Sequence, residues 1–397
     1  MRHRCITGFV NLAAVLVALS LLIPSLEAQT GGLPERGGAF RPGTRRDPGP
    51  PAPKLADGTV NLGRVEKGKG AWLPGQVQDY SKVLKDPAKG IPYMPWSKAL
   101  KDYRKDVTES AEDPQGFCIP PGGPRLQTTM FPMEIIQLPG QDRIVQILQG
   151  GGHIWREIFM DGRPQPQLFD GLDASPTFMG HSVGRWEGDT LVVDTVGFNE
   201  GTWLDMDGHP HTDQMHLIER YSRPGINVLR YEATIDDPAA YTEPWTMALD
   251  IPWGANSRIT EYICQENNRY QDNYVKHTKG LTGTGNSGAD SGHGHPVKGT
   301  FIGAWGPNAN SQDSFLILMD WDGKAITGSI NPGPDAIAIT KADMNVTDWT
   351  ITIEAGTGAN RVVMNGKFEN LTWLARSITG TYTRGNQKGT FKITRQY

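Results

Sequence analysis

Residues 178–198 read Phe-Met-Gly-His-Ser-Val-Gly-Arg-Trp-Glu-Gly-Asp-Thr-Leu-Val-Val-Asp-Thr-Val-Gly-Phe, and this stretch indicates the class of fold. Its beginning, at residues 180–184, matches the Gly-x-Ser-x-Gly signature of serine hydrolases. That signature needs a strand before the serine and a helix after it. Here the serine is followed by turn residues and then by the β-branched run 190–196, which is typical of a strand. The stretch therefore favours a β-sheet over a nucleophile elbow.

The N-terminal segment has the composition of a secretory signal peptide. Arg2 and Arg4 form a short basic start, residues 9–26 are a mostly apolar run that includes Pro24, and Ala28 offers a small residue for cleavage. We expect cleavage after Ala28 and a secreted or periplasmic protein. No later stretch approaches about 20 apolar residues, so we expect no integral membrane segment in the mature chain.

Charge and cysteine content agree with export. The formal charge is −4, and removal of residues 1–28, which hold two arginines and one glutamate, changes it to −5. A mildly acidic chain without a basic run is a poor candidate for binding nucleic acid. Two cysteines remain, Cys118 and Cys264. In an exported protein this pair predicts one disulfide, with two buried thiols as the alternative.

Composition divides the chain into segments. Residues 29–60 are rich in Gly, Pro and Arg, and we expect them to be disordered because they cannot bury enough apolar surface to fold alone. Residues 278–296 are rich in Gly and Ser and are expected to form a flexible linker. These seams predict a central β-rich domain at residues 61–277 and a second domain at residues 297–397.

The central domain reads mostly as strands. One short helix is predicted at residues 96–105, where Trp96, Leu100 and Tyr103 have helical spacing. Apolar and polar residues alternate over 229–235, as in an antiparallel sheet with one buried face. Long helices do not alternate with the strands, which disfavours a parallel α/β sheet. Strands are expected at residues 133–138, 143–148, 154–160, 190–196, 216–222, 227–235 and 258–265.

The C-terminal hundred residues repeat the strand–turn pattern, and Asp322-Gly323 is typical of a hairpin turn. Strands are expected at residues 314–320, 325–330, 336–340, 350–354, 362–368, 377–383 and 389–394. The short motifs Gly-x-Trp, Asp-Gly-Lys-Ala-Ile-Thr-Gly, Ile-Thr-Gly-Thr-Tyr and Gly-Thr-Phe in residues 297–397 resemble those of lipocalin and avidin-like barrels. That resemblance implies an up-and-down β-barrel. The fold expected is all-β, with two antiparallel β-barrel or barrel-like domains, a Gly/Ser-rich linker and one short helix near the start of the first domain.

Longer motifs in the central domain carry a second resemblance. They are Asp161-Gly-Arg-Pro, the stretch at residues 180–195, Glu219-Arg-Tyr and Glu261-Tyr-Ile-Cys-Gln-Glu-Asn-Asn. Together they resemble a family of secreted bacterial proteins to which no activity is assigned. The resemblance implies an exported bacterial protein, and it implies no reaction.

The densest group of chemically active side chains lies at residues 205–219, which hold three histidines and four carboxylates. His211 and His216, with His181 as a third imidazole, could bind Zn or another divalent metal. A solvated polar loop is the alternative, and Pro210 argues against a regular strand there.

Histidine paired with a carboxylate could also provide acid–base catalysis near neutral pH. We expect the three imidazoles to converge, because their two segments flank one strand and neighbouring strands lie about 5 Å apart. Asp194 lies in an otherwise apolar strand and needs a partner, and a structural pair with Arg185 or Arg220 is the alternative to catalysis. The candidate catalytic residues are His181, His211, His216, Asp194 and Glu219.

Arginine and aromatic side chains in the central domain favour a ligand site. Arginines clamp carboxylates or phosphates, and aromatic rings line sugar sites and apolar-ligand sites, with ordinary core packing as the alternative for the rings. We predict that the central domain binds a small-molecule or carbohydrate-like ligand. The alternative is a hydrolase or lyase that uses the histidine–carboxylate or metal site. The candidate ligand contacts are Arg156, Arg163, Arg185, Trp186, Trp203 and Tyr221.

Overall fold

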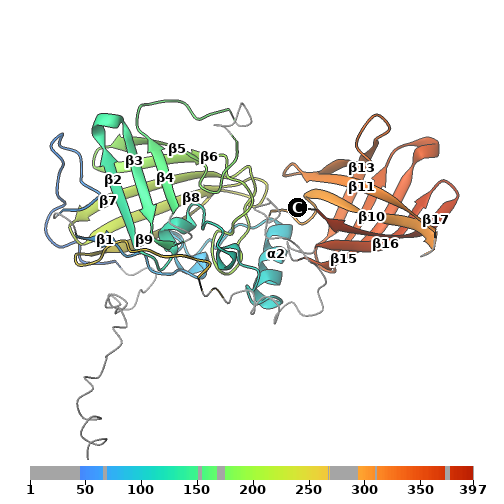
Figure 1. Cartoon of the computed structure of the whole chain (residues 1–397), viewed down its shortest axis with the longest axis horizontal. Helices are drawn as coiled ribbons and strands as arrows, with labels where there is room; N and C mark the ends of the chain where they lie inside the picture. Colours follow the sequence, from blue (N-terminus) through green and yellow to red (C-terminus); the bar gives the residue numbers. More distant parts are fainter. Residues whose placement is uncertain are drawn as a thin grey trace, which may run out of the picture. The chain divides into compact units, whose positions relative to one another are not determined.

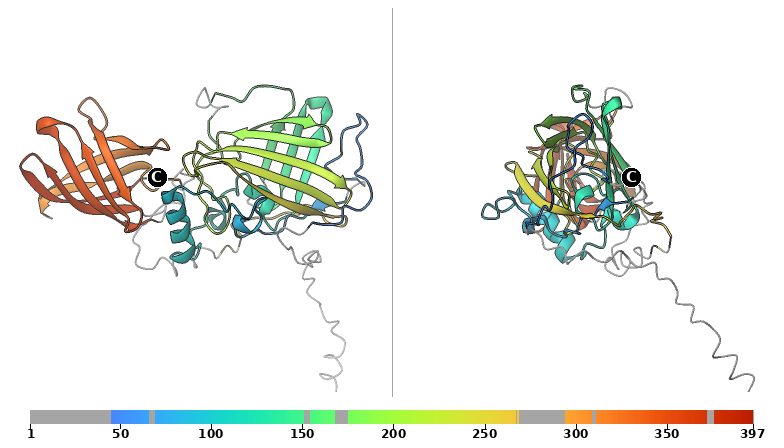
Figure 2. Two further views of the ribbon diagram at one scale, coloured as in Figure 1. Left: turned by 180° about the vertical axis from the view of Figure 1, so that it is seen from behind. Right: turned by 90° about the vertical axis from the view of Figure 1, so that its left-hand side faces the viewer.

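The computed structural model describes residues 45–65, 69–150, 154–167, 175–266, 268, 294–308, 311–371 and 376–396. Within these ranges the chain is mostly strand and forms two closed β-barrels, as predicted (Figures 1 and 2). The expected signal peptide and most of the expected linker lie outside the described residues. In the described part of the chain, no helix is long and apolar enough to cross a membrane.

The first barrel contains nine strands. Neighbouring strands are antiparallel, except that β4 and β5 run parallel. This pair departs from the all-antiparallel expectation because the connection 160–180 returns the chain to the end at which β4 began. The short strand β1 pairs with both β2 and β9 and so closes the barrel. The strands are β1 (Ala71–Trp72), β2 (Met133–Leu138), β3 (Arg143–Leu148), β4 (Ile154–Phe159), β5 (His181–Glu187), β6 (Thr190–Val196), β7 (His216–Gly225), β8 (Val228–Asp236) and β9 (Trp245–Gly254).

The second barrel is an antiparallel meander of eight strands that closes when β17 pairs with β10. The predicted hairpin is confirmed, since Trp321 pairs with Ile326 and Gly323 has a positive φ of 95° in the turn. The strands are β10 (Gly299–Asn308), β11 (Ser311–Trp321), β12 (Ile326–Ile330), β13 (Ile337–Asn345), β14 (Thr350–Ala355), β15 (Val362–Asn370), β16 (Ser377–Arg384) and β17 (Gln387–Arg395).

Alternation along the strands separates the inside of each barrel from its surface. In β8, Leu229, Tyr231, Ala233 and Ile235 are all fully buried, whereas the residues between them are half-buried. Burying one such large apolar side chain contributes about 1.5–3 kcal/mol. Strand period and burial therefore agree with the half-buried strand predicted at residues 229–235.

Among the described residues the first domain has one α-helix, α2 (Pro95–Asp106), close to the predicted range. Proline at its first position is compatible with a helix start, because that residue needs no intrahelical N–H bond. Trp96 and Leu100 are buried, and the Trp96 indole donates a hydrogen bond to the carbonyl of Ala239 at 2.9 Å. The helix therefore packs against the connection between β8 and β9.

The predicted disulfide between Cys118 and Cys264 is present. It links the end of the 3₁₀ helix η2 (Pro114–Phe117) to the segment that follows β9, across a sequence separation of 146 residues. A covalent loop of this length restricts the unfolded chain far more than the folded one.

Four strands and one segment differ from the sequence predictions. The strand expected at residues 258–265 is wrong: the segment is irregular and ends in a turn, and it is tied down by Cys264. Strands β1, β5, β9 and β10 were not expected. Residues 185–189 were expected to form a turn, yet residues 185–187 belong to β5, and Gly184 lies in the same strand, where a side chain would meet Met160 and Ile158. In these cases pairing with neighbouring strands decided the local structure more than amino-acid composition did.

Residues 45–60 are the described part of the segment expected to be disordered, and they contact the turn between β7 and β8. Pro50 and Pro48 accept hydrogen bonds from the amides of Ile226 and Asn227 at 2.9 and 3.1 Å. Val60, at the end of this stretch, is buried. Proline carbonyls remain available as acceptors although proline donates nothing, so a proline-rich segment can still cover a barrel.

Candidate functional site

One end of the first barrel carries the long connections. At this end, which we call the loop end, β2 begins, β6 ends and β7 begins, as the strand register requires. Residues 197–215 connect β6 to β7, and the segment 73–132 precedes β2. At the opposite end, short turns join β2 to β3, β5 to β6 and β7 to β8. Long loops on a rigid scaffold are the usual place for binding and catalytic groups.

The 3₁₀ helix η3 (Arg125–Thr128) is inserted at the loop end, and all four of its residues are buried. The Gln127 amide nitrogen donates to the hydroxyl of Tyr221 at 3.0 Å and to the side-chain oxygen of Gln146 at 3.3 Å. Thr128 is hydrogen-bonded to the hydroxyl of Tyr80 at 2.9 Å. The helix η3 is therefore bonded to the polar interior of the barrel.

Arg156 and Glu219 form an ion pair inside the barrel, where their side chains are 2% and 0% exposed. Arg156 also donates to the hydroxyls of Ser182 at 2.9 Å and Thr195 at 2.7 Å. Burial acts to lower the pKa of Arg156, but Glu219 outweighs it and raises that pKa. Arg156 therefore stays charged, and each side chain of the pair depends on the other to compensate for its lost hydration.

Two tyrosines complete this network. The hydroxyls of Tyr221 and Tyr231 both donate to one oxygen of Glu219, at 2.8 and 2.7 Å. Burial, reinforced by the Glu219 carboxylate, raises the pKa of both phenols, so they remain protonated donors. Gln146 lies directly opposite Arg156 on the neighbouring strand. Three buried polar atoms here have no hydrogen-bond partner among the described residues: Arg156 Nη1, Gln127 Oε1 and Gln146 Nε2.

A pocket of about 190 Å³ opens at the loop end. On its polar side Arg125 donates two hydrogen bonds to Asp113, at 2.8 and 2.6 Å, and both side chains are almost fully buried. The buried hydroxyl of Thr129 has no partner among the described residues. Met130 is 62% exposed, the largest value among the exposed apolar side chains of the described chain. The lining residues are Gln76, Val77, Asp113, Gln115, Gly116, Arg125, Thr128, Thr129, Met130, Phe131, Met206, Tyr262 and Cys264.

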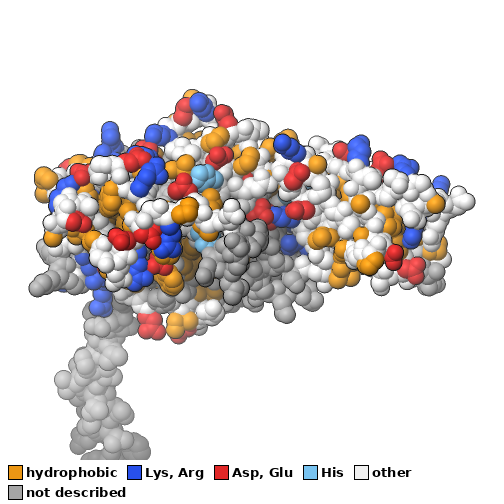
Figure 3. Space-filling view, turned by 90° about the horizontal axis from the view of Figure 1, so that it is seen from above, with side chains coloured by type: hydrophobic (Ala, Val, Ile, Leu, Met, Phe, Trp, Pro, Cys, Tyr) orange, Lys and Arg blue, Asp and Glu red, His pale blue; other side chains and the backbone are white. Residues whose placement is uncertain are grey.

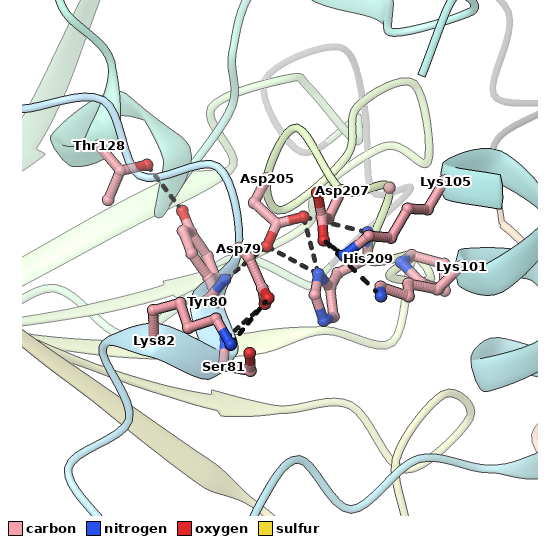
Figure 4. Close-up of polar contacts among 12 residues, drawn as sticks. Asp79, Tyr80, Ser81, Lys82, Lys101, Lys105, Thr128, Asp205, Asp207 and His209 are labelled. Carbon is pink, nitrogen blue, oxygen red and sulfur yellow. Dashed lines mark hydrogen bonds and ion pairs between the residues drawn. The ribbon is translucent and has the colours of Figure 1, made fainter. Parts of the chain in front are cut away.

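Beside this pocket, the connection 197–215 carries a buried histidine–carboxylate pair. The His209 imidazole lies 2.7 Å from the carboxylate of Asp205 through Nδ1 (Figure 4). Its other ring nitrogen, Nε2, is hydrogen-bonded to the hydroxyl of Tyr93. The backbone amide of Tyr80 donates to the same Asp205 carboxylate at 2.7 Å. Asp205 and His209 are almost fully buried, whereas Tyr93 is half-buried.

Asp79, Asp205 and His209 place one potential metal-ligand atom each within 4.8 Å of one another, the one such group in the described ranges. Their present bonds do not fit a metal site. Both ring nitrogens of His209 are bonded to protein groups. Asp79 accepts hydrogen bonds at the start of a 3₁₀ helix from the amide of Ser81 (Figure 4). The group is a hydrogen-bonded cluster whose imidazole has no free lone pair for a cation.

His211 is enclosed in the protein. Its Nε2 is hydrogen-bonded to the hydroxyl of Thr202 at 2.9 Å, and its Nδ1 lies 3.2 Å from the carbonyl of Thr212. Burial lowers the pKa of His211 to about 4, so the ring is neutral at ordinary pH. These contacts connect residues within one loop, and no group of three close metal-type ligands in the described chain includes His211.

His216 and Asp194 meet on the outer surface of the first barrel at 3.0 Å, with side chains 37% and 30% exposed. Gln165 donates to the Asp194 carboxylate at 2.9 Å. His181 is bonded instead to the carbonyl of Ser175 at 2.8 Å. The structure therefore joins Asp194 to one of the expected imidazoles, and Arg185 and Arg220 both pair with Glu187 rather than with Asp194. The catalytic and metal roles proposed for these residues stay predictions.

The other candidate ligand contacts are scattered. Arg163 forms an exposed pair with Asp161 at 2.6 Å, and Arg185 forms one with Glu187 at 2.8 Å. Trp186 is half-buried against the barrel core.

Trp203 is buried beneath the guanidinium of Arg104, which lies 4.5 Å from its ring centre. Among the predicted ligand contacts, only Arg156 and Tyr221 therefore belong to the interior network, where they join Glu219.

Sequence reasoning passed over the residues that cluster at the loop end, above all Tyr93, Asp79 and Thr129. Asp205 and His209 did offer a local signal, since a carboxylate four residues before a histidine can reach it in a tight turn. Tyr93 offered none, because it is 116 residues away from His209 in sequence.

No family model and no curated protein matches this chain. Among solved structures, it is similar to a protein of unknown function from the DUF3598 family of Nostoc punctiforme, with 9% identity, a TM-score of 0.18 and coverage of 67% of this chain and 87% of that chain. It is also similar to endo-1,5-alpha-L-arabinanase from Thermotoga petrophila, with 10% identity, a TM-score of 0.18 and coverage of 67% and 66%. TM-scores this low support no conclusion about reaction or ligand.

Proposed function

We propose that the first barrel binds a small, mainly apolar molecule that carries a hydroxyl group, in the pocket at its loop end. The proposal rests on the residues that line the pocket. Met130, Phe131 and Tyr262 offer apolar and aromatic surface, and the buried hydroxyl of Thr129 has no partner among the described residues. Apolar walls with a few converging polar groups are the usual composition of small-ligand sites.

The size of the pocket limits the ligand. Its volume of about 190 Å³ is below the 300–1,000 Å³ typical of sites for drug-sized molecules. A single ring or a short branched chain suits it, including one sugar-sized unit with an apolar face. Arg125 and Thr128 of η3 line the pocket, and Gln127 bonds this helix to Tyr221. Arg156 and Tyr221 would therefore act on the ligand by holding η3 in place.

The experiment uses benzyl alcohol as the probe and toluene, which lacks only the hydroxyl, as its matched control. Saturation-transfer NMR on the full chain should detect benzyl alcohol at a Kd of roughly 1 mM, as expected for so few ligand atoms. Thr129→Val should weaken benzyl alcohol by about two- to tenfold, the net value of one hydrogen bond, and leave toluene unchanged. Thr327→Val, on the exposed face of β12, is the control substitution.

Met130→Ala should weaken both probes. Equal binding of the two probes, unaffected by Thr129→Val and by Met130→Ala, would show that the pocket is not the site.

We also propose that the protein is exported, to the periplasm or the medium. The N-terminal composition and the Cys118–Cys264 disulfide support export, because structural disulfides persist in oxidising compartments. On the face seen in Figure 3, acidic and basic side chains are interspersed. Fractionation of producing cells followed by N-terminal sequencing should find a mature chain that begins at Gln29. A cytoplasmic chain that retains residues 1–28 would contradict the proposal.

A further inference from the structure

We propose that Tyr93 is the nucleophile of an acyl-transfer site for small neutral esters, in which His209 accepts the tyrosine proton and Asp205 positions His209. The observation behind it is the hydrogen-bond chain that runs from buried Asp205 through His209 to half-buried Tyr93. The proposal does not depend on ligand binding in the pocket described above.

The protons in this chain can be assigned from its contacts. The Asp205 carboxylate accepts hydrogen bonds from the amides of Tyr80, at 2.7 Å, and His209, at 3.2 Å. A carboxylate held in this way acts as an acceptor, so Nδ1 of His209 donates to it. Nε2 then offers its lone pair to the Tyr93 hydroxyl, which donates. The order carboxylate, imidazole, hydroxyl is the arrangement that activates a hydroxyl nucleophile.

The reaction balances with water as the second reactant. Tyr93 Oη attacks the ester carbonyl carbon while its proton moves to His209 Nε2. The bond from the carbonyl carbon to the leaving oxygen breaks, and the alcohol departs with the proton from Nε2. Water, deprotonated by His209, then attacks the acyl-tyrosine, which releases the carboxylic acid and restores the Tyr93 hydroxyl. No free phenolate is required at any stage.

Charges around the site fit a neutral substrate. Burial first, and then the carboxylates of Asp205, Asp79, Asp102 and Asp207, raise the pKa of Tyr93, so the phenol keeps its proton until His209 removes it. The same carboxylates stabilise the imidazolium that forms and would repel an anionic substrate.

Two lysines partly neutralise the negative charge of these carboxylates. Lys105 lies 2.5 Å and Lys101 3.7 Å from the Asp207 carboxylate (Figure 4). Asp79 and Asp205 remain the carboxylates nearest the imidazole, within the 4.8 Å group described above.

Acetylation by p-nitrophenyl acetate distinguishes a nucleophilic Tyr93 from a Tyr93 that only holds a loop in place through its hydrogen bond. At pH 8 the folded wild-type chain should release a burst of p-nitrophenolate approaching one per chain. Peptide mapping should place the acetyl group on Tyr93 at least about tenfold faster than on Tyr262, another half-buried tyrosine among the 11 in the chain. A purely structural Tyr93 would react no faster than Tyr262, and that result would overturn the proposal.

Substitutions assign the remaining roles. Tyr93→Phe should abolish the burst while circular dichroism stays native. Asp205→Asn should slow acetylation of Tyr93 at least about tenfold and move the midpoint of its pH profile, a change that loss of packing alone would not produce. An unchanged burst in Tyr93→Phe would contradict the proposal, and so would an unchanged pH profile in folded Asp205→Asn. If Asp205→Asn does not fold, the wild-type peptide map decides.

Discussion

The interiors of the two barrels differ in chemistry. In the second barrel most of the buried strand residues are apolar, with Phe301, Ile317, Ile353 and Ile393 fully buried, and the buried polar residues Asn370 and Arg395 lie at strand ends. In the first barrel the same kind of strand alternation directs the Arg156–Glu219 pair and its tyrosines inward. Replacing a buried ion pair by apolar residues is often neutral or stabilising. A barrel can therefore close without a polar interior. We infer that the polar network of the first barrel serves to hold the loop end in order.

The disulfide gives the largest expected difference between the barrels. For a separation of 146 residues, the chain-entropy model predicts about 5 kcal/mol of stabilisation. The double substitution Cys118→Ser and Cys264→Ser should destabilise the first barrel by up to this amount and leave the second unchanged. Hydrogen exchange resolved by peptide measures each barrel separately. An equal loss of protection in both barrels would show that they unfold as one unit.

Breaking the interior ion pair should have an effect nearly as large. Arg156→Met leaves the Glu219 carboxylate buried without its cation, which should cost about 3–5 kcal/mol in the free energy of unfolding. Ile353→Val in the second barrel is the matched core substitution and should cost about 0.5–1.5 kcal/mol. Urea unfolding of the two variants compares them directly. A loss below about 1 kcal/mol for Arg156→Met would mean that the interior is hydrated.

Acid should destabilise the first barrel through His211. Its folded-state pKa is about 4 against an ordinary value of 6.5, because the ring is buried. As the pH falls through this window, the unfolded chain binds a proton that the folded chain does not, so stability falls, by about 3 kcal/mol at the limit. Residues 297–397 contain no histidine and lack this response. His211→Gln should reduce the loss of stability between pH 7 and pH 4, and a variant that keeps the full wild-type slope would contradict the assignment.

The smallest effect is expected at the outer surface. The His216–Asp194 pair is about one-third exposed, so solvent screens it. Asp194→Asn should change the free energy of unfolding by less than about 1 kcal/mol. Thermal unfolding checks this, with Lys392→Met in the second barrel, which removes an exposed pair with Glu369, as the control. A loss of stability as large as that of Arg156→Met would show that the His216–Asp194 pair stabilises the barrel as much as the interior ion pair does.

Much of the fold could be predicted because strand period is a local property. Residues 133–138, 143–148 and 190–196 were predicted with the bounds that β2, β3 and β6 have. Strand β5 was missed, because residues 185–189 have the composition of a turn and the strand state of residues 181–187 depends on pairing with β6. The segment 258–265 shows the reverse, since its composition suits a strand but it pairs with no strand among the described residues.

The candidate site was less predictable because its members converge from distant segments. Residue type selected Arg156, Glu219 and Tyr221, but their contact depends on the closure of β4 to β8 into one barrel. Among the histidines of residues 205–219, His209 has the buried carboxylate partner, whereas we chose His211 and His216. The spacing of Asp205 and His209 was available in the sequence, and the contribution of Tyr93 required the structure.

The most direct test of the central claim, that the loop end of the first barrel is a small-ligand site, is a titration of the methyl-¹³C-methionine chain with benzyl alcohol. Met130 and Met206 line the pocket, and Met319 and Met364 lie in the core of the second barrel. We predict saturable shifts of the Met130 and Met206 methyl signals with one common Kd, and no shift of the Met319 and Met364 signals. Equal, non-saturating shifts of all four signals would contradict the account.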